Sequence, residues 1–155
     1  MRQMRHIECM MTRGEAEDRL SRENWGVLCV HGDEGYPYGV PMNYAWVNGA
    51  VLLHCTSMSS HRLDAIKWDS RVCFTVVPVH ELDRETWSTG YASVIVFGKA
   101  EIICDPEERL FAMRAFMRRL SPEKEEEAVG ICDPVKAELV MIRIVPDHIT
   151  GKKSS

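Results

Sequence analysis

Six runs of apolar residues, separated by turn-forming residues, dominate the chain from position 25 to position 145 and predict β-strands. Asn48 and Gly49 separate the second run from the third and are typical of a tight hairpin turn. Pro37 and Pro41 lie inside the second run, where they cannot donate hydrogen bonds to a neighbouring strand. We therefore expect that strand to lie at an edge or to carry a bulge. The predicted strands span 25–30, 36–46, 50–55, 71–79, 91–103 and 137–145.

Helices are predicted on either side of this β-rich region and between its strands. Thr12 and Glu15 have the spacing of a capping box, in which each side chain accepts a hydrogen bond from the other residue's backbone. The first helix is therefore expected over about 12–23. Asp105 is expected to cap an amphipathic helix over 107–120. Shorter helices are expected at 61–69 and in the segment that begins at Ser121.

The predicted elements suit one mainly β domain with flanking helices. Strands joined by short hairpins favour antiparallel pairing. Closing six strands into a small barrel removes the exposed edges that an open sheet would leave. We expect a single domain over 1–155, with an N-terminal helix at about 12–23, a barrel over about 25–146 and a C-terminal tail at 147–155.

Composition and charge narrow the class of protein. The net charge of -4 over 155 residues argues against general binding of nucleic acid. No apolar run is long enough to span a bilayer, and the N-terminus lacks the apolar segment of a secretory signal, so we expect a cytoplasmic protein. The six cysteines form no CxxC pair, so we expect reduced thiols and no metal site.

The segment from Leu53 to Lys67 is the strongest candidate for ligand binding. A loop rich in hydroxyl side chains joins an apolar strand to a helix, whose N-terminus favours an anion. Arg62 lies in the first helical turn, where an anionic ligand would explain a cation, and its guanidinium suits a phosphate. The alternative is that the serines only cap the helix and that Arg62 is solvated. No glycine-rich phosphate loop is present.

Two further candidates lie in the second and third predicted strands. Asn43 is an amide in an apolar strand and can bond the edge of a flat ligand, with Val40, Pro41 and Met42 against its face. Alternatively, Asn43 satisfies only the local backbone. His54 suits proton transfer near neutral pH, or it is a core histidine whose hydrogen bonds are satisfied.

The segments WGVLCV, GYPYGVPMNYAW, AVLLHCTSMSSHRLDAIKWDSRVCFTVV, YASVIVFGKAEI and ITGKK resemble the pyridoxamine 5′-phosphate oxidase-like FMN-binding split-barrel family. Within that family, the chain resembles the 5-nitroimidazole resistance (Nim-type) branch. The resemblance runs from about 25 to 153 and implies a six-stranded antiparallel split β-barrel. It also implies homodimers whose two FMN sites lie at the subunit interface, with ITGKK near the partner's flavin.

The resemblance assigns residues to the flavin. It implies that the loop after the third strand and the start of the next helix bind the FMN phosphate. The second strand would contact the isoalloxazine ring, and His54 would lie beside the flavin and act in catalysis. The phosphate-binding candidates are Thr56, Ser60, His61, Arg62 and Lys67, and the other flavin contacts are Val40, Pro41, Met42, Asn43, Cys55 and Ser93. Ser60 stands where many relatives have a glycine.

The function implied by the resemblance is that of an FMN-dependent oxidoreductase. It would reduce a small aromatic or nitro compound, with NAD(P)H as a transient electron donor because the sequence has no Rossmann motif. The basic residues that bind substrate in true pyridoxamine phosphate oxidases are not evident, so oxidation of vitamin B6 is not expected. The alternatives are a non-catalytic protein that binds or senses flavin or haem, and a structural dimer with an empty pocket.

Overall fold

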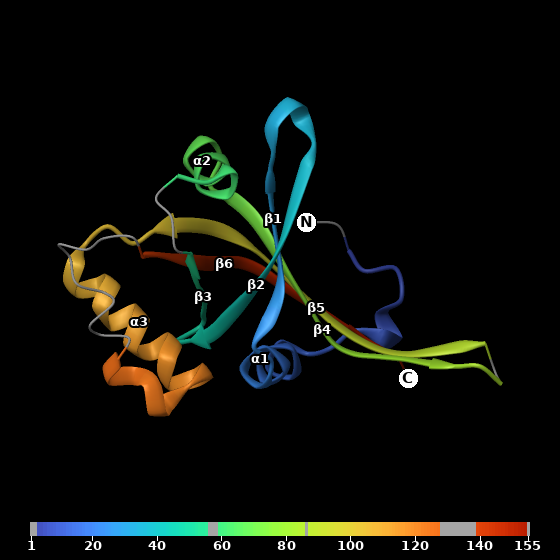
Figure 1. Ribbon diagram of the computed structural model, residues 1–155. Helices are drawn as coiled ribbons and strands as arrows, with labels where there is room; N and C mark the ends of the chain where they lie inside the picture. Colours follow the sequence, from blue (N-terminus) through green and yellow to red (C-terminus); the bar gives the residue numbers. More distant parts are fainter. Residues whose placement is uncertain (1–2, 56–58, 86, 128–138, 155) are drawn as a thin grey trace.

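The six strands close into an antiparallel barrel, as the sequence predicts, and their order around it is β1-β2-β3-β6-β5-β4 (Figure 1). This computed structural model describes residues 3–55, 59–85, 87–127 and 139–154. The strands are β1 (Trp25–His31), β2 (Pro37–Val47), β3 (Ala50–Cys55), β4 (Arg71–Asp83), β5 (Ser88–Ile102) and β6 (Val140–Lys153). The helices are α1 (Arg13–Arg22), α2 (His61–Trp68) and α3 (Pro106–Leu120), with short 3₁₀ turns at Ile7–Cys9, Asp33–Gly35 and Pro122–Lys124.

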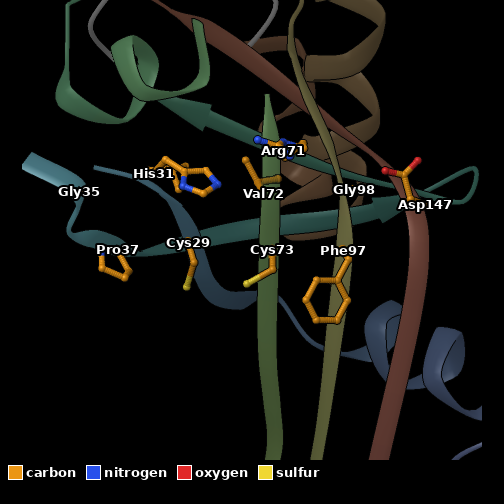
Figure 2. Close-up of a pocket in the computed structure, with 11 residues that line it drawn as sticks. Cys29, His31, Gly35, Pro37, Arg71, Val72, Cys73, Phe97, Gly98 and Asp147 are labelled. Carbon is orange, nitrogen blue, oxygen red and sulfur yellow. The ribbon is translucent and has the colours of Figure 1, made fainter. Parts of the chain in front are cut away.

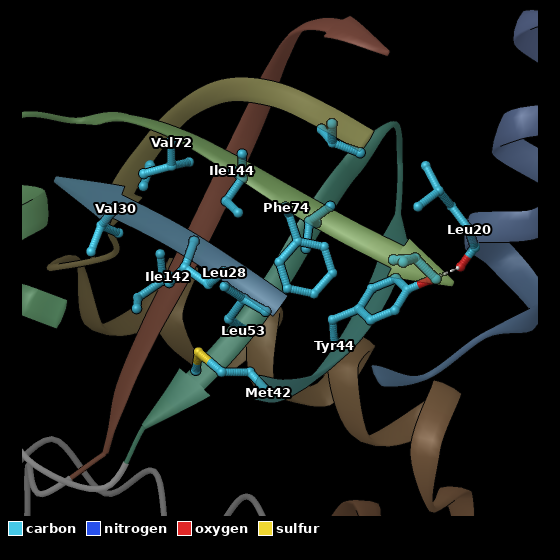
Figure 3. Packing of buried hydrophobic residues seen from close by; sticks show 14 of the residues in the cluster. Leu20, Leu28, Val30, Met42, Tyr44, Leu53, Val72, Phe74, Ile142 and Ile144 are labelled. Atoms are coloured by element: carbon cyan, nitrogen blue, oxygen red, sulfur yellow. Dashed lines mark hydrogen bonds between the residues drawn. The ribbon is translucent and has the colours of Figure 1, made fainter. Parts of the chain in front are cut away.

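Alternate residues of each strand point inward and fill the interior of the barrel. Leu28 of β1, Phe74 of β4 and Leu53 of β3 are fully buried there (Figure 3). Successive residues of a strand point to opposite faces, so the same strands also present an outer face, which is half-buried along β1, β4 and β5. This outer face is important for the candidate site described below.

The two predicted caps and the predicted hairpin are confirmed. In α1, the backbone N–H of Glu15 donates to Thr12 Oγ1 (3.3 Å), and that of Thr12 donates to Glu15 Oε2 (2.8 Å). Asp105 Oδ1 accepts from the backbone N–H of Glu108 (2.8 Å) at the start of α3. Asn48 (φ 50°) and Gly49 (φ 77°) both adopt left-handed conformations, as a two-residue turn between paired strands requires.

The edge predicted from the two prolines is also confirmed. The whole of β2 up to Asn43 pairs with β1, whereas its pairing with β3 is confined to Tyr44–Val47. At Pro37 and Pro41, β2 therefore has β1 on one side and no paired strand among the described residues on the other. The missing N–H groups of the two prolines thus interrupt no hydrogen bonds between strands.

Helix α3 covers a second apolar cluster on the outside of the barrel. Its buried residues Met113 and Phe116 pack with Leu52 of β3 and Met141 of β6. Helix α1 closes one end of the barrel instead, because its buried Leu20 belongs to the main core. Among the described residues, no helix combines the length and apolar character needed to cross a membrane.

The expected C-terminal tail at 147–155 is wrong. Strand β6 continues to Lys153, because β5 offers it a partner as far as Ala92, with a shift in register after Phe97. Strands β4 and β5 are also longer than predicted, and they form a hairpin that projects from the barrel (Figure 1). The helix expected after Ser121 begins as the 3₁₀ turn at Pro122–Lys124, and residues 128–130 of that segment lie outside the described residues.

Candidate functional site

The start of α2 leaves a polar side chain unused where a helix cap would be expected. Ser60 is the N-cap, and its backbone carbonyl accepts from the N–H groups of Leu63 (2.9 Å) and Asp64 (3.0 Å). Its side chain makes no capping hydrogen bond. The sequence left open whether the serines serve only as caps, and for Ser60 the structure excludes that alternative.

Three buried side-chain atoms of the described residues have no hydrogen-bond partner: His54 Nδ1, Ser60 Oγ and Arg62 Nε. They come from the end of β3 and the first turn of α2. Leaving a buried polar group without a partner costs about 1–3 kcal/mol, and more for a charged group. Arg62 is half-buried rather than fully solvated, and its Nε is one of the buried atoms without a partner. Arg62 lies close enough to His54 for its charge to act on the imidazole, and a polar, negatively charged ligand at the start of α2 would supply missing partners.

His54 lies on the outer face of β3, beneath α3. Its ring packs edge-on against Phe116, with ring centroids 5.0 Å apart. Burial lowers the pKa of His54 below its usual value, and the positive charge of Arg62 lowers it further. The imidazole is therefore neutral at pH 7 and suits hydrogen bonding to a ligand better than proton donation as an imidazolium. Its predicted catalytic role stays a prediction.

His61 faces the turn between β1 and β2. Its Nε2 accepts a hydrogen bond from the backbone N–H of Asp33 (3.2 Å), and its ring stacks on Tyr38 with centroids 4.2 Å apart. These contacts anchor the start of α2 to the barrel. Lys67 lies in the last turn of α2 and pairs with Asp64 (3.5 Å). The structure thus assigns both residues other partners, and their predicted phosphate contacts stay untested.

The four β2 candidates do not share one face of the sheet. Met42 is buried in the barrel core and Val40 packs against it, whereas Pro41 and Asn43 face outward. The side chains of Val40 and Met42 therefore lie on the opposite face of β2 from Pro41, because alternate residues of a strand point apart, and the predicted flavin contacts of this strand stay untested. Asn43 Nδ2 donates to the backbone carbonyl of Asn24 (3.2 Å), which is the local alternative that the sequence allowed.

The remaining candidates also differ in position. Cys55 is buried in the barrel core. Ser93 is half-buried on the outer face of β5 and pairs with Lys152 of β6. Thr56 lies outside the described residues.

A pocket of about 390 Å³ opens on the outer face of the barrel, across β1, β4, β5 and β6 (Figure 2). Cys29 and Cys73 lie at its centre, with Phe97 beside them. His31, Arg71 and Asp147 supply polar groups around it. The sequence analysis missed this pocket, since its residues meet only through strand pairing. The available signal was the alternation in WGVLCV and RVCFTVV, which places both cysteines opposite the buried residues.

The chain belongs to the pyridoxamine 5′-phosphate oxidase family, whose model matches residues 12–153. This match confirms the family that the sequence resembles. A search of curated protein sequences found no significant match.

Solved structures with the same fold are similar to nearly the whole chain. One from Bacteroides thetaiotaomicron, provisionally named a 5-nitroimidazole antibiotic resistance protein, is 23% identical, with a TM-score of 0.77, over 92% of this chain and 85% of that one. An FAD-binding protein from Mesorhizobium loti is 22% identical, with a TM-score of 0.70, over 94% and 96%. An FAD and haem binding protein from Mycobacterium smegmatis is 19% identical, with a TM-score of 0.76, over 95% and 74%.

Proposed function

We propose that this protein binds FMN and is an oxidoreductase that reduces a small aromatic or nitro compound. The observation that carries the proposal is the set of partnerless buried atoms on His54, Ser60 and Arg62. Membership of the pyridoxamine 5′-phosphate oxidase family and the flavins named for similar structures support it.

The residues at the start of α2 fit a phosphate monoester. The Arg62 guanidinium supplies charge-assisted hydrogen bonds, and the Ser60 hydroxyl donates another. The first N–H groups of α2 lie outside its internal hydrogen bonds and favour the same anion. His54, neutral at pH 7, adds a hydrogen bond without adding charge. A phosphate there would satisfy all three partnerless atoms at once.

The outer face of the sheet fits the flat part of such a cofactor. It is half-buried and largely apolar, and Pro41 and Ser93 lie on it. A bound flavin would supply the electron transfer, accepting two electrons from a nicotinamide and passing them to the acceptor. The protein's contribution is to bind the phosphate, orient the ring and shield one side of it from water.

A homodimer is part of this proposal. The outer face leaves Val27 and Ile95 half-buried in a single chain. The β4–β5 hairpin carries exposed Val77, Leu82 and Trp87, which is 90% exposed. A second copy that covers these apolar groups would complete the flavin site from both sides. Light scattering of the purified protein tests this, and a monomer at micromolar concentration contradicts it.

The experiment for cofactor binding is an absorption spectrum of the protein as purified, followed by titration of the apoprotein with FMN, FAD and haem. Arg62→Ala and Ser60→Ala should weaken FMN binding, Arg62→Ala by about 10- to 100-fold, as expected for lost charge-assisted hydrogen bonds. Arg22→Ala, on the exposed side of α1, is the matched control and should bind FMN normally. Preference for haem, or equal binding by all variants, contradicts the proposal.

Catalysis is tested separately with the flavin-loaded protein. NADH or NADPH should bleach the flavin without oxygen, and a nitroaromatic compound should restore the colour. A loaded protein that no donor reduces would be a flavin carrier rather than an oxidoreductase.

A further inference from the structure

Cys29 of β1 and Cys73 of β4 lie directly opposite each other in an antiparallel strand pair. Both alternate with buried core residues, so both side chains leave the sheet on the same outer face. The side chains of Cys29 and Cys73 lie side by side in the outer pocket (Figure 2).

This register suits a covalent bond between the two sulfur atoms. Directly opposed residues of antiparallel strands have Cα atoms about 4.5–5.5 Å apart. Disulfides span Cα separations of about 4.4–6.8 Å. The backbone therefore needs no large movement to join them. The pocket gives a small oxidant access to the pair, whereas Cys55 is buried in the core.

We propose that Cys29 and Cys73 are a redox-active dithiol that closes reversibly into a disulfide when it meets a small disulfide such as oxidised glutathione. The site is separate from the partnerless atoms at the start of α2, and it does not depend on flavin binding. The closed form joins β1 to β4 across the pocket and changes the surface that the pocket offers to a ligand.

The reaction proceeds by two thiol–disulfide exchanges. Burial, together with the neighbouring Cys29, raises the pKa of Cys73 to about 11, so Cys73 remains a thiol near neutral pH. In the order we propose, Cys29 loses its proton and attacks first. An S–S bond forms between Cys29 and one glutathione, and the other glutathione leaves as a thiol. Cys73 then loses its proton, attacks the Cys29 sulfur and releases the second glutathione. The two cysteines lose two electrons and two protons, and one glutathione disulfide becomes two thiols.

The test equilibrates the full-length protein, with and without FMN, in glutathione buffers from fully reduced to fully oxidised. Remaining thiols are then alkylated, and the digested protein is analysed by mass spectrometry. We expect a linked pair of peptides containing Cys29 and Cys73, two hydrogens lighter than the separate peptides, and its loss on adding dithiothreitol. The linkage should form in both samples, while far-UV circular dichroism shows that the barrel remains folded.

Single cysteine variants distinguish the cysteine that attacks glutathione disulfide first from the cysteine that then closes the protein disulfide. Cys73→Ser should trap glutathione on Cys29, whereas Cys29→Ser should prevent both the linkage and most adduct formation. Cys104→Ser, at an exposed cysteine beyond the end of β5, is the matched control and should leave the linkage unchanged. Failure of the folded protein to form the linkage in the most oxidising buffer overturns the proposal. So does a disulfide that joins two chains, or an adduct that stays on Cys29 in the unmodified protein.

Discussion

Arg62 lies close enough to His54 for its positive charge to lower the pKa of the imidazole beyond the effect of burial. Both side chains also have a buried nitrogen without a hydrogen-bond partner. An anion bound between the two side chains would supply partners for both nitrogens and offset the charge of Arg62. The pair therefore supports an anion site at the start of α2.

The pH dependence of folding should report on His54. Its pKa is lowered from 6.5 in the folded protein, so the unfolded chain takes up the proton first as the pH falls. The free energy of unfolding should therefore be unaffected by His54 above its unfolded pKa and should decrease below pH 6.5. Urea denaturation at pH 7.5 and 5.5 measures this, with His54→Gln as the variant that removes part of the decrease. An equal decrease in both proteins contradicts the assignment.

Inorganic phosphate should reverse the lowering of the His54 pKa. A bound anion screens Arg62 and accepts a hydrogen bond from the imidazole, so the pKa of His54 should rise. An NMR titration of the His54 ring protons, with and without phosphate, measures the shift. The exposed His80 on β4 is the control, and phosphate should leave the chemical shifts of its ring protons unchanged. An unchanged His54 would show that the anion does not bind beside it.

The hydroxyl of Tyr44 should stabilise the contact between α1 and the barrel. Tyr44 is fully buried, and its hydroxyl donates to the backbone carbonyl of Leu20 (2.8 Å; Figure 3). Tyr44→Phe removes the donor and leaves that carbonyl unpaired, which should cost about 1–3 kcal/mol of unfolding free energy. Tyr36→Phe is the control, since Tyr36 is 72% exposed. Similar urea midpoints for the two variants would show that the buried hydroxyl contributes little.

Two phenylalanines of α3 should differ sharply in their contribution to stability. Phe116 is buried against β3 and contacts His54, whereas Phe111 is 63% exposed. Phe116→Ala should lower the free energy of unfolding by about 3–5 kcal/mol through lost burial and a cavity. Phe111→Ala should change it by less than about 0.5 kcal/mol. Chemical denaturation distinguishes them, and equal losses would mean that α3 does not pack as described.

Local signals in the sequence predicted the helix starts and turns of the barrel well, because each of these features is determined within a few residues. The Thr12 capping box, the Asn48-Gly49 turn and the prolines of β2 each constrain backbone over one turn. The full length of β6 could not be predicted in this way. Residues 147–153 are mostly polar and become a strand because the extended β5 pairs with them.

The parts of the candidate site also differ in whether local sequence signals could predict them. The positions of Ser60 and Arg62 at the start of α2 were predictable, since the sequence marks that helix start clearly. The outer pocket depends on which residues of β1, β4 and β5 lie opposite one another, and that register is a property of the folded sheet.

The central claim is that the start of α2 binds the phosphate of a flavin, and the most direct measurement compares FMN with riboflavin, which lacks the phosphate. Titration of the apoprotein with each ligand gives two dissociation constants, and their ratio isolates the phosphate. We expect the unmodified protein to prefer FMN by about 10-fold or more, and Arg62→Ala to lose most of that preference. Equal affinity for both ligands, or an Arg62→Ala variant that keeps the preference for FMN, would contradict the account.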